Sequence, residues 1–237
     1  MIAEILPPGI VVRETLDDDP AASLAAGEEA VLGYAVPARR REFATTRGCA
    51  RRALAALGLP PGPLLAGPDR EPLWPAGVAG SMTHCPGYRA AAVAKREDFL
   101  SMGIDAEPHR ELPEGVLDSI ALREEQAWIQ SAPVTGVCWG TVLFSAKESV
   151  FKAWFPLAGR RLGFDDALIH FDPLRGTFYA RLLIPGPLVG GRRIEGFDGR
   201  FCLANQFVLS FAGLTAAPSS RSLHAGCVAA GQSFRVR

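Results

Sequence analysis

Apolar and polar positions follow a helical period most clearly between residues 37 and 57. The apolar positions there lie three, four or seven residues apart, as on one face of a helix: Phe43, Ala50, Leu54 and Leu57. Proline suits a first helical turn, and Gly58 followed by two prolines ends the pattern. We therefore predict a helix from Pro37 to Leu57, followed by a loop over residues 58–77, which are rich in glycine and proline.

Strand patterns follow this loop. The segments Tyr88–Lys95 and Leu100–Glu107 flank a short polar turn at residues 96–98, which predicts an antiparallel hairpin closed by Pro108. Weaker patterns before the helix suggest a strand at Ile10–Val12 and a helix at Glu28–Tyr34.

The second half of the chain repeats this mixture of helices and strands. We expect helices over Glu114–Gln130 and Ser145–Phe155, the second stopped by Pro156. A strand meander then covers three segments: Ala167–Phe171, Thr177–Ile184 and Phe201–Phe211. We expect the small, polar tail after Ala216 to fray. Helices combined with antiparallel strand pairs predict an α+β protein.

The amino-acid composition limits the kinds of molecule that we expect the protein to bind. Hydrophobic residues make up 48% and charged residues 21% of the 237 residues, and 25 basic residues balance 25 acidic ones. This zero net charge gives no reason to expect binding to nucleic acid or to a membrane surface. Glu4 and two prolines interrupt any signal-peptide core, and no apolar run approaches the ~20 residues that span a bilayer. Five scattered cysteines without a CxxC pair indicate reduced thiols, so we expect a cytoplasmic protein.

Two carboxylates in Gly103-Ile104-Asp105-Ala106-Glu107 are candidate metal ligands. Residues two apart on a strand point to the same face, so Asp105 and Glu107 would lie side by side. Like charges at that distance repel unless a cation lies between them, and hard oxygen ligands suit magnesium. The structural alternative is an exposed strand end that carries two acids.

The segment Phe144–Lys152 has an ordinary structural explanation. Ser145 with Glu148 forms a capping-box pattern, and Glu148 with Lys152 forms an i,i+4 ion pair. Taken alone, this segment requires no ligand.

Two further groups could bind phosphate. Gly80–Cys85 predicts a small polar turn that offers hydroxyls, backbone N–H groups and an imidazole. Arginines crowd the helix at residues 39–52, and arginine makes bidentate contacts to phosphate. The structural alternatives are a surface turn with a histidine and a solvated basic helix face.

The order of these motifs resembles that of the Sfp/EntD-type 4′-phosphopantetheinyl transferases, a long single-chain class. The matching motifs are R-R-R-E-F-x-x-x-R from Arg39, G-x-x-x-x-P-x-W-P from Gly67, G-S-M-T-H-C from Gly80, G-I-D-A-E-P from Gly103 and F-S-A-K-E-S-V-F-K from Phe144. These motifs span over half of the chain. The residues around His84 and Pro108 are most similar to those of the actinobacterial branch of the family. The resemblance implies transfer of phosphopantetheine from coenzyme A to a serine of an apo carrier protein. It also implies two similar α+β halves, residues 1–102 and 103–237, with the active site between them.

The resemblance also implies roles for individual residues. Asp105, Glu107 and Glu148 would hold magnesium, or manganese in its place, and Asp105, Glu148 and Lys152 would carry the catalysis, with Glu148 or a metal-held water as the base. The residues implied in binding coenzyme A are Arg39, Arg47, Arg70, Ser81, Thr83, His84, Lys147 and Lys152. Glu124 and Glu125 fall near another acid proposed for the family.

The implied partners are acyl or peptidyl carrier proteins of polyketide, nonribosomal peptide or fatty-acid synthases. A monomer would suffice, and Arg51 could help to dock an acidic carrier. Two alternatives remain open from the sequence: a magnesium-dependent phosphatase or nuclease that uses the same acids, and a non-catalytic module that binds coenzyme A. Binding to DNA is disfavoured by the neutral charge.

Overall fold

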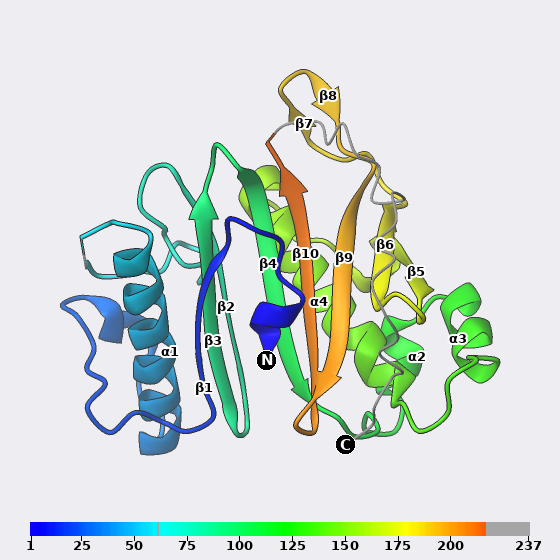
Figure 1. Ribbon diagram of the computed structural model, residues 1–237, viewed down its shortest axis with the longest axis horizontal. Helices are drawn as coiled ribbons and strands as arrows, with labels where there is room; N and C mark the ends of the chain where they lie inside the picture. The colour runs from blue at the N-terminus through cyan, green and yellow to red at the C-terminus, as the bar shows by residue number, and fades with distance from the viewer. Residues whose placement is uncertain (61, 217–237) are drawn as a thin grey trace.

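The N-terminal part of the protein is a small sheet with one long helix packed beside it (Figure 1). The computed structural model describes residues 1–60 and 62–216, so the expected fraying after Ala216 lies outside the described residues. The sheet has the order β1-β3-β2, and helix α1 packs against it. The elements of this part are η1 (Ile2–Glu4), β1 (Val11–Thr15), η2 (Glu28–Val31), α1 (Pro37–Ala56), β2 (Val78–Cys85) and β3 (Tyr88–Lys95). The helix predicted from Pro37 is confirmed, although residues 44–50 in its middle are all buried, not only those on one face.

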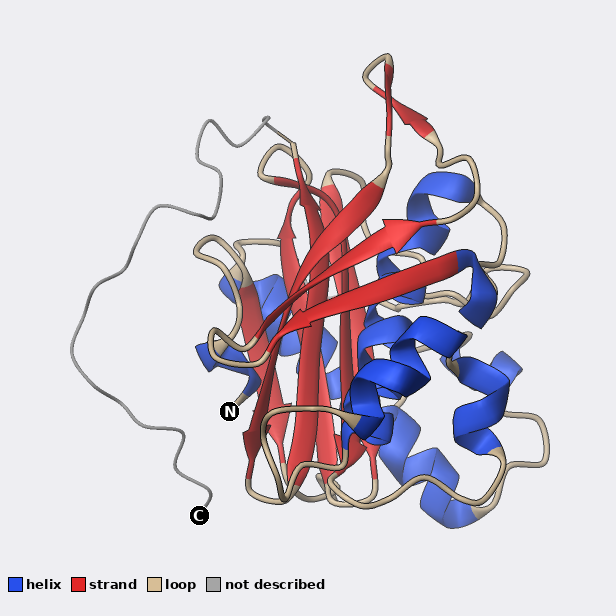
Figure 2. Ribbon diagram, turned by 90° about the vertical axis from the view of Figure 1, so that its right-hand side faces the viewer, coloured by secondary structure: helices blue, strands red, loops and turns tan. Residues whose placement is uncertain are grey.

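The C-terminal part is a five-stranded antiparallel sheet with the order β4-β10-β9-β6-β5. Helices α2, α3 and α4 gather on one of its faces (Figure 2). A small hairpin of β7 and β8, in the connection from β6 to β9, projects beyond the ends of the strands (Figure 1). The elements are β4 (Phe99–Pro108), α2 (Val116–Ile120), α3 (Arg123–Gln130), α4 (Trp139–Ala158), η3 (Phe164–Asp166), β5 (Ala167–Asp172), β6 (Thr177–Leu182), β7 (Leu188–Val189), β8 (Arg192–Arg193), β9 (Gly196–Ala204) and β10 (Phe207–Thr215). Helices combined with antiparallel sheets confirm the α+β class.

Side chains join the two sheets where β2 lies beside β4. The hydroxyl of Ser81 accepts the backbone N–H of Ile104 at 3.0 Å, and that of Thr83 accepts the N–H of Ala106 at 3.1 Å. The predicted turn at Gly80–Cys85 is therefore wrong, because this segment is most of β2. Ser81 and Thr83 can be buried because their hydroxyl oxygen atoms accept hydrogen bonds from backbone N–H groups of β4. These bonds stand in place of backbone–backbone hydrogen bonds between β2 and β4.

The predicted hairpin between Tyr88–Lys95 and Leu100–Glu107 is also wrong in its pairing. Both strands exist, but β3 pairs with β2 and β1, whereas β4 pairs with β10. The true hairpin joins β2 to β3 through Pro86 and Gly87, whose φ of 82° favours glycine. Strand β2 thus lies between the two strands that we expected to pair, and the expected domain boundary after Met102 falls inside β4.

Two of the predicted elements are each divided into two in the structure. The expected helix Glu114–Gln130 breaks at Ala121 and Leu122, where the backbone is extended and the Glu125 carboxylate accepts the Leu122 N–H. The expected strand Phe201–Phe211 is two strands, because Asn205 and Gln206 turn the chain with positive φ.

Helix α4 begins six residues before Ser145, so the predicted capping box does not exist. Ser145 is instead buried inside the helix and hydrogen-bonds to Ser210 at 2.8 Å. The helix continues past Pro156 and ends at Gly159, whose left-handed backbone favours glycine.

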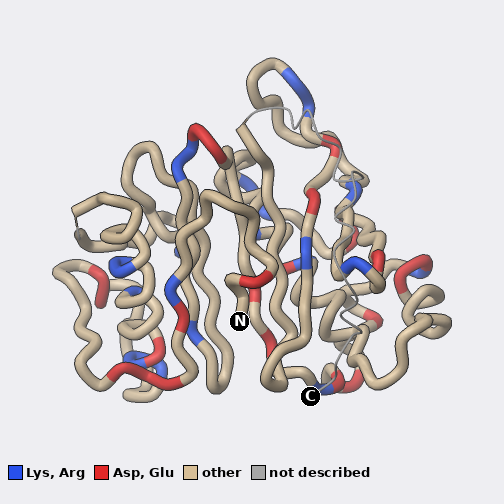
Figure 3. The backbone as a smooth tube through the Cα atoms, viewed as in Figure 1, with Lys and Arg blue, Asp and Glu red and all other residues tan. Residues whose placement is uncertain are grey.

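Along the backbone, acidic and basic residues are interspersed in both parts of the chain (Figure 3). Within the described residues, no helix is both long enough and apolar enough to cross a membrane. The chemistry must therefore come from local clusters of side chains.

Candidate active site

A cavity of about 950 Å³ lies between α1, the loop at residues 69–77 and β2 on one side and the C-terminal end of α4 on the other. This volume lies at the upper end of the ~300–1,000 Å³ range of small-molecule sites. Six basic side chains line the cavity: Arg39, Arg47, Arg70, Arg96, Lys152 and Arg161. The acidic residues in the lining are Asp69 and Glu71. This excess of positive charge suits a ligand with several phosphate groups.

Helix α1 supplies the most firmly held of these cations. Arg47 is 5% exposed, its Nε donates to the carbonyl of Leu64 at 3.2 Å, and its guanidinium lies 3.4 Å from the ring centre of Phe43. Burial lowers the pKa of Arg47 to about 10, so the group stays charged at neutral pH. Its orientation toward the cavity is thus set before any ligand binds.

Arg39 and His84 meet at the same end of the cavity. Arg39 Nη1 lies 2.8 Å from His84 Nε2 and 2.6 Å from Glu42 Oε2, and Glu42 Oε1 lies 3.1 Å from His84 Nδ1. Burial lowers the pKa of His84, as do the charges of Arg39, Lys152 and Arg89, and the charge of Glu42 opposes them. The predicted phosphate ligands Arg39 and His84 are therefore brought together across two elements.

Asp105 and Glu107 lie on the face of β4 that α4 crosses. Gly103 permits this crossing, because a Cβ at that position would lie 1.9 Å from the carbonyl oxygen of Ser149. Lys152 Nζ donates to Asp105 Oδ1 at 2.7 Å and to the carbonyl of Ile104 at 3.0 Å. The predicted ion pair between Glu148 and Lys152 is wrong, because the ammonium group points to β4 instead.

The three carboxylates repel one another. Burial raises the pKa of Glu107 to about 7, and the charges of Asp105 and Glu148 add to this effect against that of Lys152. Burial also raises the pKa of Glu148, again with a contribution from Asp105. Asp105 Oδ2 is buried and has no hydrogen-bond partner among the described residues.

These observations bear on the predicted metal site. Among residues 1–60 and 62–216, no three His, Cys, Asp or Glu side chains are grouped closely enough to hold a metal ion. The donor set nevertheless fits a hard divalent cation, because an unpartnered carboxylate oxygen lies beside two carboxylates whose pKa values are raised. Asp105, Glu107 and Glu148 therefore suit magnesium by their chemistry, although they do not form a converged site.

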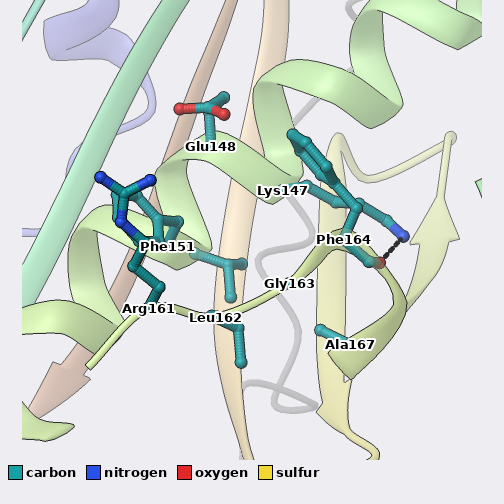
Figure 4. Close-up of a pocket in the computed structure, with 9 residues that line it drawn as sticks. Lys147, Glu148, Phe151, Arg161, Leu162, Gly163, Phe164 and Ala167 are labelled. Carbon is teal, nitrogen blue, oxygen red and sulfur yellow. Dashed lines mark hydrogen bonds between the residues drawn. The ribbon is translucent and has the colours of Figure 1, made fainter. Parts of the chain in front are cut away.

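Lys147 lies on a different side of α4 from Glu148 (Figure 4). Its ammonium group donates to the carbonyls of Ile120 and Phe164 at 2.8 and 2.6 Å and pairs with Glu125 at 2.7 Å. The prediction that Lys147 contacts coenzyme A does not fit this placement, because all of these partners belong to the protein. Glu125 is likewise committed to this buried pair.

A smaller pocket of about 200 Å³ adjoins Glu148. Phe151, Leu162 and Phe164 supply much of its apolar lining, and Arg161 lies at its edge beside Phe151 (Figure 4). Because Arg161 and Phe151 also line the larger cavity, the two spaces share a boundary. Glu148 lines the smaller pocket and is not among the residues that line the large cavity.

The predicted ligand residues divide into those that reach the large cavity and those that do not. Arg39, Arg47, Arg70, Ser81, His84 and Lys152 line it. Thr83 is outside the lining, and its hydroxyl lies between Asp105 and the backbone of β4.

The sequence interpretation missed Arg96 and Arg161 as residues of the cavity. Arg96 was assigned only to a turn, and Arg161 followed a helix end without a motif. No local pattern could have identified them, since they line the same cavity as Arg39 only through packing of segments more than fifty residues apart in the sequence.

Comparison with known proteins supports a single family. The profile of the 4′-phosphopantetheinyl transferase N-terminal domain matches residues 27–94, and that of the 4′-phosphopantetheinyl transferase superfamily matches residues 101–189.

Curated relatives match over most of their length. The chain is 53% identical to the 4′-phosphopantetheinyl transferase Svp of Streptomyces mobaraensis, over 89% of this chain and 87% of that protein. It is 45% identical to Npt of Nocardia iowensis, over 89% and 98%, and 42% identical to PptT of Mycobacterium tuberculosis, over 89% and 96%. On these matches, the chain belongs to the 4′-phosphopantetheinyl transferase family.

Proposed function

We propose that the chain transfers the 4′-phosphopantetheine group of coenzyme A to a serine of an apo carrier protein and releases 3′,5′-ADP. The observation that carries this proposal is the cation-lined cavity that ends at the Lys152–Asp105 pair. Coenzyme A carries a 3′-phosphate and a pyrophosphate, so it matches a cavity of about 950 Å³ lined by six cations better than a ligand with one phosphate does. Membership in the 4′-phosphopantetheinyl transferase family argues against both alternatives. These are a magnesium-dependent phosphatase or nuclease, and a non-catalytic module that binds coenzyme A.

The residues at the end of the cavity suit an in-line phosphoryl transfer. The serine Oγ attacks the β-phosphorus, and the bond from that phosphorus to the bridging oxygen breaks. The bridging oxygen leaves with the electron pair as part of 3′,5′-ADP. Lys152 lies where it could offset negative charge on the phosphate oxygens, which is where most catalysis of this reaction arises.

The serine proton must go to a base, and Glu148 is our candidate. Its carboxylate makes no ion pair with another described residue, and Glu148 lines the smaller pocket, one helical turn before Lys152. Burial raises its pKa, which brings a carboxylate closer to the range in which it accepts a proton efficiently.

Asp105, Glu107 and Glu148 are the residues that we propose to hold magnesium, or manganese in its place. The metal would supply positive charge to the pyrophosphate. The side chains of Glu107 and Glu148 would have to turn toward Asp105 Oδ2 to share one ion.

Both parts of the chain contribute to the proposed site. The N-terminal part supplies Arg39, Arg47 and Arg70, with Ser81 and His84, to bind phosphate groups, and the C-terminal part supplies the carboxylates and Lys152. We propose that residues 1–102 and 103–237 act as two halves around one cavity, with Thr83 contributing through its contact with Asp105. One chain would then suffice as a monomer.

The carrier substrates that we propose are acyl or peptidyl carriers of polyketide, nonribosomal peptide or fatty-acid synthases. A cytoplasmic location stays a prediction, and the four cysteines within the described residues are all unpaired, in keeping with it: Cys49, Cys85, Cys138 and Cys202.

Intact-mass spectrometry of an apo carrier protein tests the function. We expect the carrier to gain one phosphopantetheine mass when it is incubated with the protein, coenzyme A and magnesium. Asp105→Ala should abolish the gain, whereas Asp172→Asn, which removes a carboxylate from an exposed ion pair, should not. No gain on carriers from all three synthase classes, by a protein that binds coenzyme A, would support the binding module instead.

A further inference from the structure

Glu42 is a charged residue at the cavity end that the proposed reaction leaves without a role. Its carboxylate accepts a hydrogen bond from Arg39 at 2.6 Å and lies 3.1 Å from His84 Nδ1. Arg89 Nη2 lies 3.9 Å from the same carboxylate, and Arg89 is itself held by Asp18 at 2.7 Å. Glu42 thus connects α1 to both β2 and β3, at the point where Arg39 and His84 line the cavity.

The contacts of His84 assign its proton. The ionised Glu42 carboxylate can only accept, so Nδ1, which lies 3.1 Å from Glu42 Oε1, must donate. Arg39 Nη1 lies near both ring nitrogens, at 2.8 Å from Nε2 and 3.3 Å from Nδ1. The ring proton of neutral His84 then sits on Nδ1, from which it is donated to Glu42 Oε1. Glu42 therefore selects the tautomer as well as the orientation of the ring.

A phosphate group would change this arrangement, because its oxygen atoms accept hydrogen bonds and cannot donate them when it is fully ionised. Arg39 can turn its guanidinium to the phosphate, but His84 Nε2 can contact a phosphate oxygen only after it takes up a proton from solvent. The charged groups that act on the ring are Glu42 and Arg39 of α1, Arg89 of β3 and Lys152 of α4. Of these, Glu42 alone favours the protonated ring.

We propose that Glu42 is a positioning residue for coenzyme A: it holds Arg39 and His84 side by side and balances the charge of His84 when that ring takes up a proton against a phosphate group of the ligand. The inference rests on the proposed function, since it takes coenzyme A as the ligand. It assigns Glu42 no contact with the reacting atoms.

Isothermal titration calorimetry of coenzyme A tests this role, in two buffers with different ionisation enthalpies. The unmodified protein should take up protons on binding, and its affinity should rise as the pH falls. Glu42→Gln should weaken binding about 10-fold, as expected for a lost contact between charged groups, and should reduce the proton uptake. Glu42→Asp, which keeps the charge on a shorter side chain, should restore the proton uptake and part of the affinity.

Two comparisons separate this role from a purely structural one. His84→Gln, which cannot titrate, should remove the proton uptake, and Glu42→Gln in that background should weaken binding less than it does alone. Asp172→Asn serves as the control for loss of one carboxylate and should bind as the unmodified protein does. A matching loss for 3′-dephospho-coenzyme A would place the contact at the pyrophosphate, and a loss confined to coenzyme A would place it at the 3′-phosphate; both support the proposal.

Two results would overturn the proposal. Unchanged affinity and proton uptake in Glu42→Gln would show that Glu42 does not act through His84. Tighter binding would show that Glu42 competes with the phosphate for Arg39. If the unmodified protein fails to bind coenzyme A, the proposed function is wrong, which is a separate outcome.

Discussion

Lys147 and Lys152 lie five residues apart on the same helix, yet their environments are opposite. The Lys147 side chain is 3% exposed, and its ammonium group has three partners within the protein. The Lys152 side chain is 26% exposed, lines the large cavity and pairs with a carboxylate whose second oxygen has no partner among the described residues. Lys147 thus fastens α4 to its neighbours, whereas Lys152 leaves bonding capacity for a ligand.

The difference shows how to separate structural from functional charges in one motif. Burial lowers the pKa of Lys147, and the hydrogen bond and charge of Glu125 oppose that shift. The pair is completed by backbone groups, since Glu125 also accepts the N–H groups of Leu122 and Ile169 at 2.8 Å. A cluster satisfied in this way has nothing left to offer a substrate.

The largest expected effect is on stability, from Lys147→Met. This substitution leaves Glu125 buried without its cation, which should cost about 3–5 kcal/mol of unfolding free energy. Urea denaturation measures the loss, and Glu124→Gln on the neighbouring exposed position is the control. Full stability in the variant would contradict the structural assignment of Lys147.

Glu125→Gln sharpens the same test. Because both substitutions break one pair, the double variant Lys147→Met/Glu125→Gln should lose less stability than the sum of the two single losses. Additive losses would show that the two side chains act independently.

Lys152→Met should act on turnover. We expect kcat/KM for the carrier to fall about 100-fold, because a positive charge next to the reacting phosphate is lost. The loss of stability should be smaller than for Lys147→Met, since the Lys152 side chain is already 26% exposed and Asp105 Oδ1 keeps the hydrogen bond from the Thr83 hydroxyl. Lys95→Met, at an exposed ion pair with Glu97, is the matched control, and similar activity in both variants would contradict the role of Lys152.

Thr83→Val tests whether the hydroxyl of Thr83, between β2 and β4, stabilises the fold as Lys147 does or binds the ligand as proposed for Lys152. The backbone N–H of Ala106 loses its acceptor, which should cost about 1–3 kcal/mol in urea denaturation. Thr83→Ser should recover most of that loss. A large fall in affinity for coenzyme A without loss of stability would instead make Thr83 a ligand residue.

The smallest effect is expected from Arg51→Ala on carrier recognition. Arg51 donates to Glu28 at 2.8 and 2.9 Å and to the carbonyl of Ser23 at 2.6 Å, so it is committed within the protein. The carrier KM and its salt dependence should stay within about twofold of the unmodified values. A weaker salt dependence would revive the hypothesis that Arg51 docks the carrier.

The sequence predicted elements better than it predicted their pairing. The helix from Pro37 was recovered from the spacing of its apolar positions, and strands β3 and β5 begin at Tyr88 and Ala167, where the sequence placed them. Strand β2 was missed because its small polar residues mimic a turn, although they are buried against β4. The pairing of β3 with β4 was wrong because a local turn cannot reveal that a third strand lies between them.

The sequence by itself determined the family and the types of residue at the site. The order of the motifs indicates the family, and the motifs contain the carboxylates, Lys152 and the arginines. The tertiary structure alone decided which members of those motifs face the cavity. Lys147 and Thr83 match the motifs as well as Lys152 and Ser81 do, yet they turn inward. Glu42, Arg96 and Arg161 carry no recognised role, yet they reach the cavity or its ligand residues. The physical reason is that motifs record chemical type along the chain, whereas burial and the partners available to each polar group depend on segments distant in sequence.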